Sequence, residues 1–149
     1  MNKLVLIALC LISSATLAQA NMGSCDLGGA KTAAEAWKTA FEGNEPSHVV
    51  DLYAADGILN PTLSNSIVSN QSDRMAHFTG LFEKLRSRTV DFTNTSFREI
   101  NGVVMHSGHW TFRGILNGKE SEIKARVSFV YAGNDCLIHD HHSSVFPLN

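Results

Sequence analysis

Two Asn-Gly pairs constrain the fold of this chain more than any other feature of its sequence: Asn101-Gly102 and Asn117-Gly118. Asn-Gly between apolar runs favours a two-residue β-hairpin turn, because both residues readily adopt the left-handed backbone conformation that such a turn requires. Gly133-Asn134 indicates a third turn. Consecutive hairpins form an antiparallel meander, so we expect four paired strands. They cover residues 90–100, 103–116, 119–131 and 136–144.

The part of the chain before these strands has the periodicity of helices. Apolar residues recur at helical spacing in three segments, and Trp37 and Phe41 belong to the first apolar face. Residues 58–69, which contain Pro61, are predicted to be irregular. The predicted helices run from Thr32 to a stop at Gly43-Asn44, from Pro46 to a stop at Asp56-Gly57, and from a cap at Ser72 to the region of Arg86 and Arg88.

Three helices followed by four strands predict an α+β fold, in which the helices pack on one face of a curved antiparallel sheet. The strands are long, which favours β-bulges, and Gly108 and Gly114 are the expected bulge sites. A bent sheet covered by helices encloses a cone whose open end is a natural pocket. We expect one domain over residues 31–149, preceded by a flexible, Gly-rich arm over residues 21–30.

Residues 1–20 have the pattern of a secretory signal peptide. A short positive start precedes an apolar run over residues 4–17, and Ala18-Gln19-Ala20 is a small-x-small cleavage signal. A lipoprotein signal fits less well, because Cys10 lies inside the apolar run. No second apolar segment long enough for a membrane span follows. We therefore expect a periplasmic or secreted protein that has no membrane contact after cleavage.

Cleavage after Ala20 would leave two cysteines, Cys25 and Cys136. An even pair in an exported protein favours a disulfide between them. The alternative is two separate thiols. The spacing fits neither a CxxC redox pair nor a zinc site.

Composition and motif spacing argue against several function classes. The net charge is −2 and no Lys/Arg stripe is present, so nucleic acid is not an expected partner. Asp140, His142 and Ser144 share one face of the last predicted strand, but residues two apart on a strand lie about 6–7 Å apart, which does not suit a catalytic triad. The Gly-x-Ser-x-Gly motif of many serine hydrolases is also absent from the sequence.

The last predicted strand is rich in polar groups that need partners if they are buried. Strand alternation places His139, His141 and Ser143 on one face. A metal could bind His139 and His141 together with His106 or His109, but the His-x-His spacing supplies only two ligands. The preferred interpretation is a hydrogen-bonded wall of a pocket, and we predict no metal and no cofactor.

Arg126 lies in the middle of a predicted strand, on the face opposite to Val127 and Phe129. A guanidinium at such a position either points to solvent or binds a carboxylate in a pocket, and the spacing alone favours solvent.

Several motifs occur in an order typical of one family. The chain resembles the NTF2-like superfamily, specifically the bacterial relatives of the calcium/calmodulin-dependent kinase II association domain, which overlap with SnoaL-like and DUF4440-type proteins. The resemblance covers nearly the whole chain after residue 20. It rests on Trp37, Leu52-Tyr53-Ala54-Ala55-Asp56, Leu59-Asn60-Pro61-Thr62-Leu63, His77-Phe78, Ser107-Gly108-His109-Trp110-Thr111-Phe112, residues 125–131, and His141-His142-Ser143-Ser144 before Pro147.

The resemblance implies a cone-shaped barrel with a deep pocket and a homodimer or higher homo-oligomer formed through the sheet. In the kinase association domain the pocket holds arginines that bind small carboxylates. The matching positions here are His109 and Ser143, so that arginine set is not retained, whereas Arg126 follows the bacterial pattern. Cys136 stands where the family usually has Trp, which supports the disulfide.

These observations lead to one favoured function and two alternatives. We expect an exported, oligomeric protein whose pocket binds a small, carboxylate-bearing molecule. The first alternative is an isomerase, dehydratase or hydrolase that uses a pocket histidine as general base; the second is a purely structural assembly module. The expected ligand-binding residues are Arg126, which would pair with the anion, His109, His141 and Ser143, which would orient it, and Tyr53 and His77, which would complete the wall.

Overall fold

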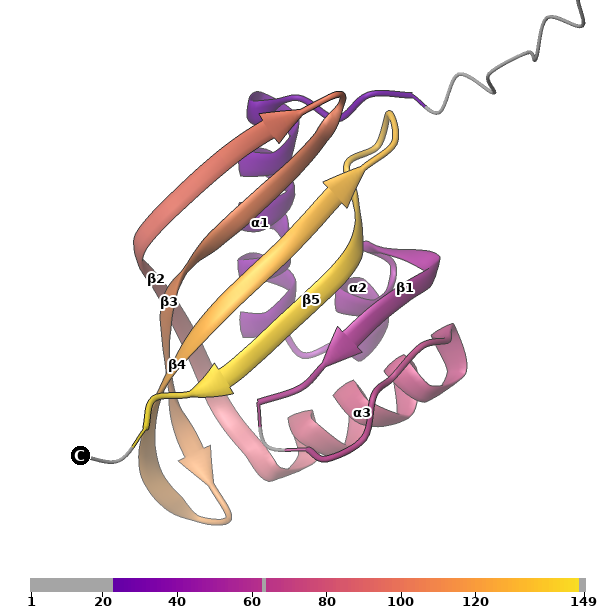
Figure 1. Ribbon diagram of the computed structural model, residues 1–149. Helices are drawn as coiled ribbons and strands as arrows, with labels where there is room; N and C mark the ends of the chain where they lie inside the picture. Colours follow the sequence, from indigo (N-terminus) through magenta and orange to yellow (C-terminus); the bar gives the residue numbers. More distant parts are fainter. Residues whose placement is uncertain (1–22, 63, 148–149) are drawn as a thin grey trace, which may run out of the picture.

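The computed structural model describes residues 23–62 and 64–147, which form a curved five-stranded sheet and three helices (Figure 1). The elements in chain order are α1 (Leu27–Glu42), α2 (Pro46–Val50), β1 (Tyr53–Asn60), α3 (Gln71–Lys84), β2 (Leu85–Ile100), β3 (Val103–Leu116), β4 (Lys119–Ala132) and β5 (Leu137–Val145). The sheet order is β1-β5-β4-β3-β2, with β1 parallel to β5 and the other neighbours antiparallel. In Figure 1, α1 lies behind the strands, and α3 lies next to β1 beside the sheet. The predicted α+β fold is confirmed.

The hairpin turns form where the sequence predicts them. Asn101-Gly102 and Asn117-Gly118 have φ values between 50° and 81°, as two-residue turns with left-handed backbone require. β2 begins at Leu85, earlier than the predicted start at residue 90, and follows α3 directly. The buried guanidinium of Arg88 donates hydrogen bonds to the carbonyl oxygens of Phe41 and Leu85, at 3.0 and 2.8 Å, and so ties β2 to the ends of α1 and α3.

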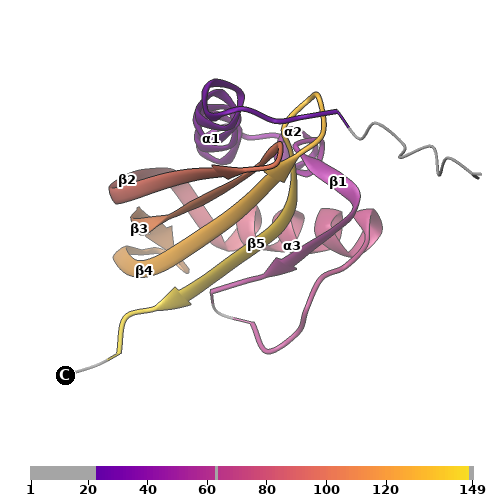
Figure 2. The same cartoon turned by 45° about the horizontal axis from the view of Figure 1, so that its top comes forward.

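The bulges that curve the sheet lie opposite the expected glycines. The β2–β3 register shifts twice in β2, where Ser87 and Asn94 have φ values of 49° and 51°. Gly114 and Gly108 stand across from these two shifts on β3. A β-carbon on Gly114 would lie 2.7 Å from the Arg86 carbonyl oxygen, so glycine allows the bulged strand to approach closely. The turned view in Figure 2 shows the resulting curvature.

The sequence predicts a helix up to Asp56-Gly57 and an irregular segment from residue 58, and both predictions are wrong where strand β1 forms, from Tyr53 to Asn60. Instead α2 ends at Val50, and β1 adds to the edge of the sheet by pairing with β5. The buried side chain of Arg74, from α3, donates to the carbonyl oxygens of Ala54, Ala55 and Gly57, where the β1 register shifts. These bonds satisfy backbone groups that the irregular pairing leaves free.

The segment before α1 belongs to the fold, so the prediction of a flexible arm over residues 21–30 is wrong from Cys25 onward. Asp26 caps α1 by accepting a hydrogen bond from the Gly29 backbone at 2.7 Å, so the helix begins at Leu27 rather than Thr32. Cys25 is buried and forms the predicted disulfide with Cys136, with the two Cα atoms 4.9 Å apart. The bond joins the start of α1 to the β4–β5 turn.

The predicted signal peptide over residues 1–20 lies outside the described residues. Among the helices that are described, none is long and apolar enough to span a membrane.

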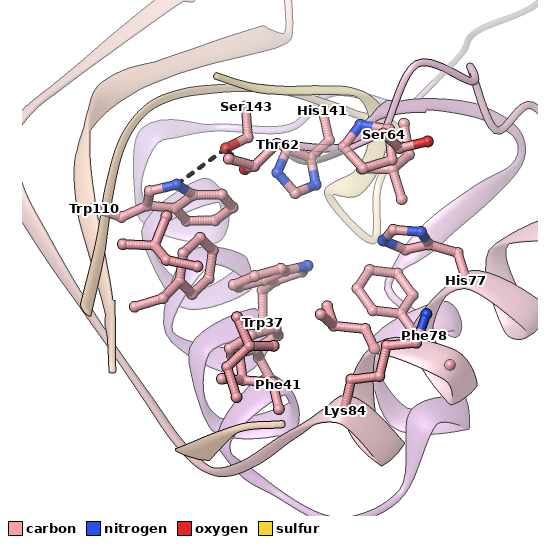
Figure 3. Close-up of a pocket in the computed structure, with 18 of the residues that line it drawn as sticks. Trp37, Phe41, Thr62, Ser64, His77, Phe78, Lys84, Trp110, His141 and Ser143 are labelled. Carbon is pink, nitrogen blue, oxygen red and sulfur yellow. Dashed lines mark hydrogen bonds between the residues drawn. The ribbon is translucent and has the colours of Figure 1, made fainter. Parts of the chain in front are cut away.

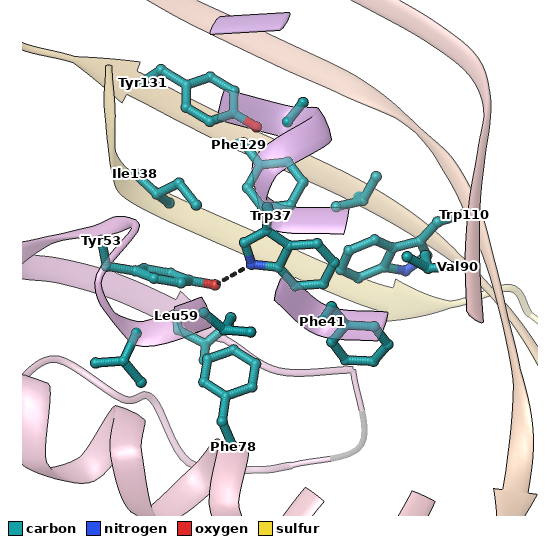
Figure 4. Packing of buried hydrophobic residues seen from close by; sticks show 14 of the residues in the cluster. Trp37, Phe41, Tyr53, Leu59, Phe78, Val90, Trp110, Phe129, Tyr131 and Ile138 are labelled. Carbon is teal, nitrogen blue, oxygen red and sulfur yellow. Dashed lines mark hydrogen bonds between the residues drawn. The ribbon is translucent and has the colours of Figure 1, made fainter. Parts of the chain in front are cut away.

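An aromatic core fills the space between α1 and the concave face of the sheet (Figure 4). Trp37 lies at its centre, stacked on Phe41 at 5.0 Å and on Trp110 at 5.2 Å between ring centroids, with Phe129 edge-on at 5.7 Å. The core continues toward α3 through Phe78, and it leaves one end of the cone unfilled.

Candidate functional site

The unfilled end of the cone is a cavity of about 420 Å³ between α1, α3 and the concave face of the sheet (Figure 3). Its walls are mainly aromatic and aliphatic. The side chain of Lys84 lies at the opposite side of the opening from His141 in Figure 3. The aromatic lining residues are Trp37, Phe41, Phe78, Trp110 and Phe112, and the polar ones are Thr62, Ser64, His77, Lys84, His141 and Ser143.

A chain of three buried side chains ends at the cavity. Trp37 Nε1 donates a hydrogen bond to Tyr53 Oη at 3.2 Å, and Tyr53 Oη lies 2.6 Å from His141 Nδ1. His141 is only 2% exposed, and its Nε2 atom is buried with no hydrogen-bond partner among the described residues. His141 lines the cavity, so its wall contains a buried polar atom without a partner among the described residues.

Burial keeps the titratable side chains of this hydrogen-bonded series, Tyr53 and His141, uncharged. It lowers the pKa of His141 well below the usual 6.5, and the neighbouring histidines His77, His142 and His106 lower it further. Burial also raises the pKa of Tyr53 above its usual 10, so the phenol keeps its proton. The pKa of His77 is lowered by burial as well, so both cavity histidines are neutral at pH 7.

Two hydroxyl groups lie beside His141. Trp110 Nε1 donates to Ser143 Oγ at 3.1 Å, and Ser143 Oγ forms a short hydrogen bond with Thr62 Oγ1. Thr62 reaches this position from the segment that follows β1, whereas Ser143 points inward from β5. The two hydroxyl groups and His141 make one polar corner in a cavity with otherwise apolar walls (Figure 3).

The structure brings four of the six expected site residues together. His141, Ser143 and His77 line the cavity, and Tyr53 supports His141 from behind. Lys84 is a cavity residue that sequence reasoning missed, since a lysine in the last turn of a helix carries no signal beyond a favourable helix-dipole interaction.

The other two expected residues lie on the outer face of the sheet, so the prediction that Arg126 and His109 face the pocket is wrong. They are register partners on β4 and β3, and their sequence neighbours Ala125 and Trp110 are the residues that point inward. The Arg126 side chain is exposed. Because successive residues of a strand point to opposite faces, a buried Ala125 and Val127 require Arg126 to point outward.

His139 also differs from its prediction. β5 pairs Ile138 with Tyr131 and Asp140 with Val130, so His139 is an extra residue in a bulge. It is exposed, whereas His141 is buried, and the two rings do not form the proposed metal-binding pair. Within residues 23–62 and 64–147, no group of three or more His, Cys, Asp or Glu side chains is arranged to hold a metal ion.

Comparison with known proteins identifies the fold. No family model matches the chain, and no curated protein matches it. Among solved structures, a candidate calcium/calmodulin-dependent protein kinase II association domain from Xanthomonas campestris is 31% identical to this chain, with a TM-score of 0.72. The similarity covers 80% of this chain and 88% of the Xanthomonas protein.

Two further structures are too distant in sequence to show more than the fold. A candidate dehydratase of the NTF2-like family from Streptomyces avermitilis is 12% identical, with a TM-score of 0.74 and coverage of 83% of this chain and 97% of that one. A protein with a ketosteroid isomerase-like fold from Catenulispora acidiphila, in complex with trimethylamine, is 14% identical, with a TM-score of 0.58 and coverage of 74% and 82%. Together with the more similar Xanthomonas protein, these structures show that the chain belongs to the NTF2-like superfamily, among the relatives of the calcium/calmodulin-dependent protein kinase II association domain.

Proposed function

We propose that the protein binds a small, largely apolar molecule in the cavity and holds that molecule's carboxyl or carbonyl group at His141. The observation that carries the proposal is the unpartnered His141 Nε2 atom, buried at the polar corner of an otherwise apolar cavity. A buried polar group without a partner costs about 1–3 kcal/mol, and a ligand that supplies the partner recovers that cost. A structurally similar protein holds a small molecule, trimethylamine, in its crystal structure.

The walls of the cavity suit the body of such a ligand. Trp37, Trp110 and Phe78 present rings against which an aromatic or alicyclic molecule packs. The volume of about 420 Å³ lies in the range of small-molecule sites. Arg126 is exposed on the outer face and has no part in this site, so the polar group of the ligand would meet neutral hydrogen-bond donors rather than the arginine first expected there.

We further propose that the protein acts after export, as one domain that associates with itself through the outer face of the sheet. The disulfide between Cys25 and Cys136 supports an oxidising compartment, since such bonds are rare in the cytosol. The similarity to an association domain supports self-association. Light scattering during size-exclusion chromatography tests the oligomer, and a monomer at all concentrations would contradict it.

Isothermal titration calorimetry tests ligand binding with a panel of aromatic acids and their methyl ketone analogues. His141→Leu removes the donor, and we expect it to weaken the tightest-binding compound about tenfold, as loss of one buried hydrogen bond implies. Arg126→Ala, on the outer face, is the matched control and should bind like the wild type. Equal affinities for the wild type and His141→Leu would refute binding at His141. Loss of binding in Arg126→Ala would instead place the binding site on the outer face of the sheet.

A second candidate function is catalysis of proton transfer beside a carbonyl group. His77 lines the same cavity, is neutral because burial lowers its pKa, and makes no hydrogen bond with the described residues. Such an imidazole can act as a general base while His141 holds the carbonyl oxygen. NMR detection of deuterium exchange at the α-carbon of a bound ketone tests this role. The catalytic role is ruled out if exchange is no faster with the protein than in buffer alone, or if His77→Gln exchanges the deuterium as fast as the wild type.

A further inference from the structure

We infer that Trp37 and Tyr53 hold His141 in one neutral tautomer, with its proton on Nε2, so that the cavity selects a ligand whose buried polar group is an uncharged acceptor. A ketone, aldehyde or similar carbonyl oxygen is the chemical class that fits. The tautomer follows from the protein alone, whereas the ligand class rests on the proposed function.

In the series of hydrogen bonds from Trp37 through Tyr53 to His141, the indole of Trp37 fixes the direction of each bond. An indole N–H can only donate, so Tyr53 Oη accepts from Trp37 Nε1. The phenol proton then needs an acceptor, and His141 Nδ1, at 2.6 Å, is the one acceptor that the described residues offer it. A neutral imidazole that accepts at Nδ1 carries its proton on Nε2.

The opposite assignment leaves a buried proton without a partner. If His141 Nδ1 donated to Tyr53 Oη, that oxygen would receive two donors, and its own proton would find no acceptor among the described residues. Tyr53 is 5% exposed and its ring packs against Phe78 and lies 5.3 Å from the Arg74 guanidinium carbon. The phenol is therefore confined to the geometry in which it donates to His141.

The neighbouring hydroxyl groups also present a donor to the cavity. Ser143 Oγ already accepts a hydrogen bond from Trp110 and shares one proton with Thr62. Only one of the two hydroxyl protons can lie between those oxygens, so the other is free to donate. A carbonyl oxygen has two lone pairs and can accept from both this hydroxyl group and His141 Nε2. An alcohol oxygen can accept in the same way, but it brings a proton of its own that must find an acceptor among the hydroxyl oxygens of this corner.

The charge of the corner argues against an anion. His141 and His77 are neutral, Arg126 lies on the outer face, and Lys84 stands across the opening from His141 (Figure 3). Lys84 lines the cavity on the side away from His141, so a carboxylate held at His141 would have no cation beside it, and burying it there costs much more than burying a ketone. The ligand's buried group is accordingly a neutral carbonyl.

Long-range ¹H–¹⁵N correlation spectra of the unliganded protein, labelled with ¹⁵N-histidine, test the tautomer. We expect a single neutral His141 form, protonated at Nε2, at pH 7 and pH 8. Tyr53→Phe should produce a mixture of tautomers. Tyr131→Phe is the matched control, because Tyr131 is also a buried phenol but its hydroxyl group makes no hydrogen bond with the described residues. A wild-type spectrum with Nδ1 protonated, or with both forms, overturns the inference even if the variants do not fold.

Binding of matched probes tests the ligand class. We expect 2-acetylnaphthalene, the ketone, to bind at least about tenfold tighter than either 2-naphthoate or the corresponding alcohol. In Tyr53→Phe the ratio of these affinities should be smaller. Naphthoate or the alcohol binding as tightly as the ketone overturns the selectivity, while the proposed binding function stands. If none of the three probes binds, the proposed function and the ligand class both fail, and the spectra alone decide the tautomer.

Discussion

Protonation of one buried histidine outside the cavity should weaken the fold in mild acid. His106 is 1% exposed, and neither of its ring nitrogens has a hydrogen-bond partner among the described residues. Its ring is stacked on Phe97 at 4.1 Å and on Phe129 at 5.6 Å between centroids. Burial lowers the pKa of His106 from the usual 6.5 to about 4.

The sign of the effect follows from which state binds the proton. Between pH 6.5 and pH 4 the ring is charged in the unfolded chain and neutral in the folded one, so acid favours unfolding. The stability that the neutral, buried His106 ring contributes is fully present above pH 6.5 and is lost as the pH falls toward 4. The two pKa values correspond to a loss of about 2 kcal/mol of unfolding free energy between pH 7 and pH 5.

His106→Phe keeps the aromatic stack and removes the titrating group. Urea unfolding followed by tryptophan fluorescence at pH 7 and pH 5 measures both proteins, and we expect the variant to lose about 2 kcal/mol less than the wild type. His141 also has a lowered pKa and contributes to the wild-type loss, so the difference between the two proteins is the relevant quantity. His139→Phe, at an exposed position, is the control. Equal losses in His106→Phe and wild type would refute the reasoning.

Three further predictions concern stability, measured by the same urea unfolding. Replacing Cys25 and Cys136 by serine should cost about 2–4 kcal/mol, because the disulfide closes a segment with a sequence separation of 111 residues; an unchanged midpoint would show that the bond contributes nothing. Gly114→Ala should destabilise by about 1–3 kcal/mol, since its β-carbon would meet the Arg86 carbonyl oxygen at 2.7 Å. Gly80→Ala, in α3 with nothing within 4 Å of the added carbon, should instead stabilise by up to about 1 kcal/mol.

The strands that hairpin turns define were predictable from the sequence. Asn101-Gly102 and Asn117-Gly118 set the ends of β3, which has the predicted bounds Val103–Leu116. Turn chemistry is local, because the left-handed backbone at both positions favours Asn and Gly whatever surrounds them. The disulfide was predictable for a similar reason, since the signal-peptide pattern and the even number of cysteines after it do not depend on the details of packing.

The orientation of side chains was predictable only where alternation is unbroken. Along β4 it places Arg126 opposite to Val127 and Phe129, and the burial of those two residues assigns Arg126 to the outer face. The resemblance to relatives whose pocket holds arginines instead favours a position for Arg126 on the inner face, inside the pocket. Along β5 the bulge at His139 changes the phase by one residue, and no Gly or Pro in the sequence marks it. His139 and His141 therefore seemed to share a face that they do not share.

The candidate site depends on the one strand that local sequence could not predict. Tyr53 opens β1, and β1 is held by parallel pairing with β5 and by the bonds from Arg74 to its carbonyl oxygens. That placement brings Tyr53 from one edge of the sheet to His141, which is 88 residues away in sequence, and completes the chain that begins at Trp37. If residues 53–56 had continued α2 as a helix, Tyr53 would not be a register partner of β5 and His141 Nδ1 would lack its donor. The property that we assign to the cavity, a fixed Nε2 donor, is thus a consequence of tertiary pairing rather than of any motif around His141.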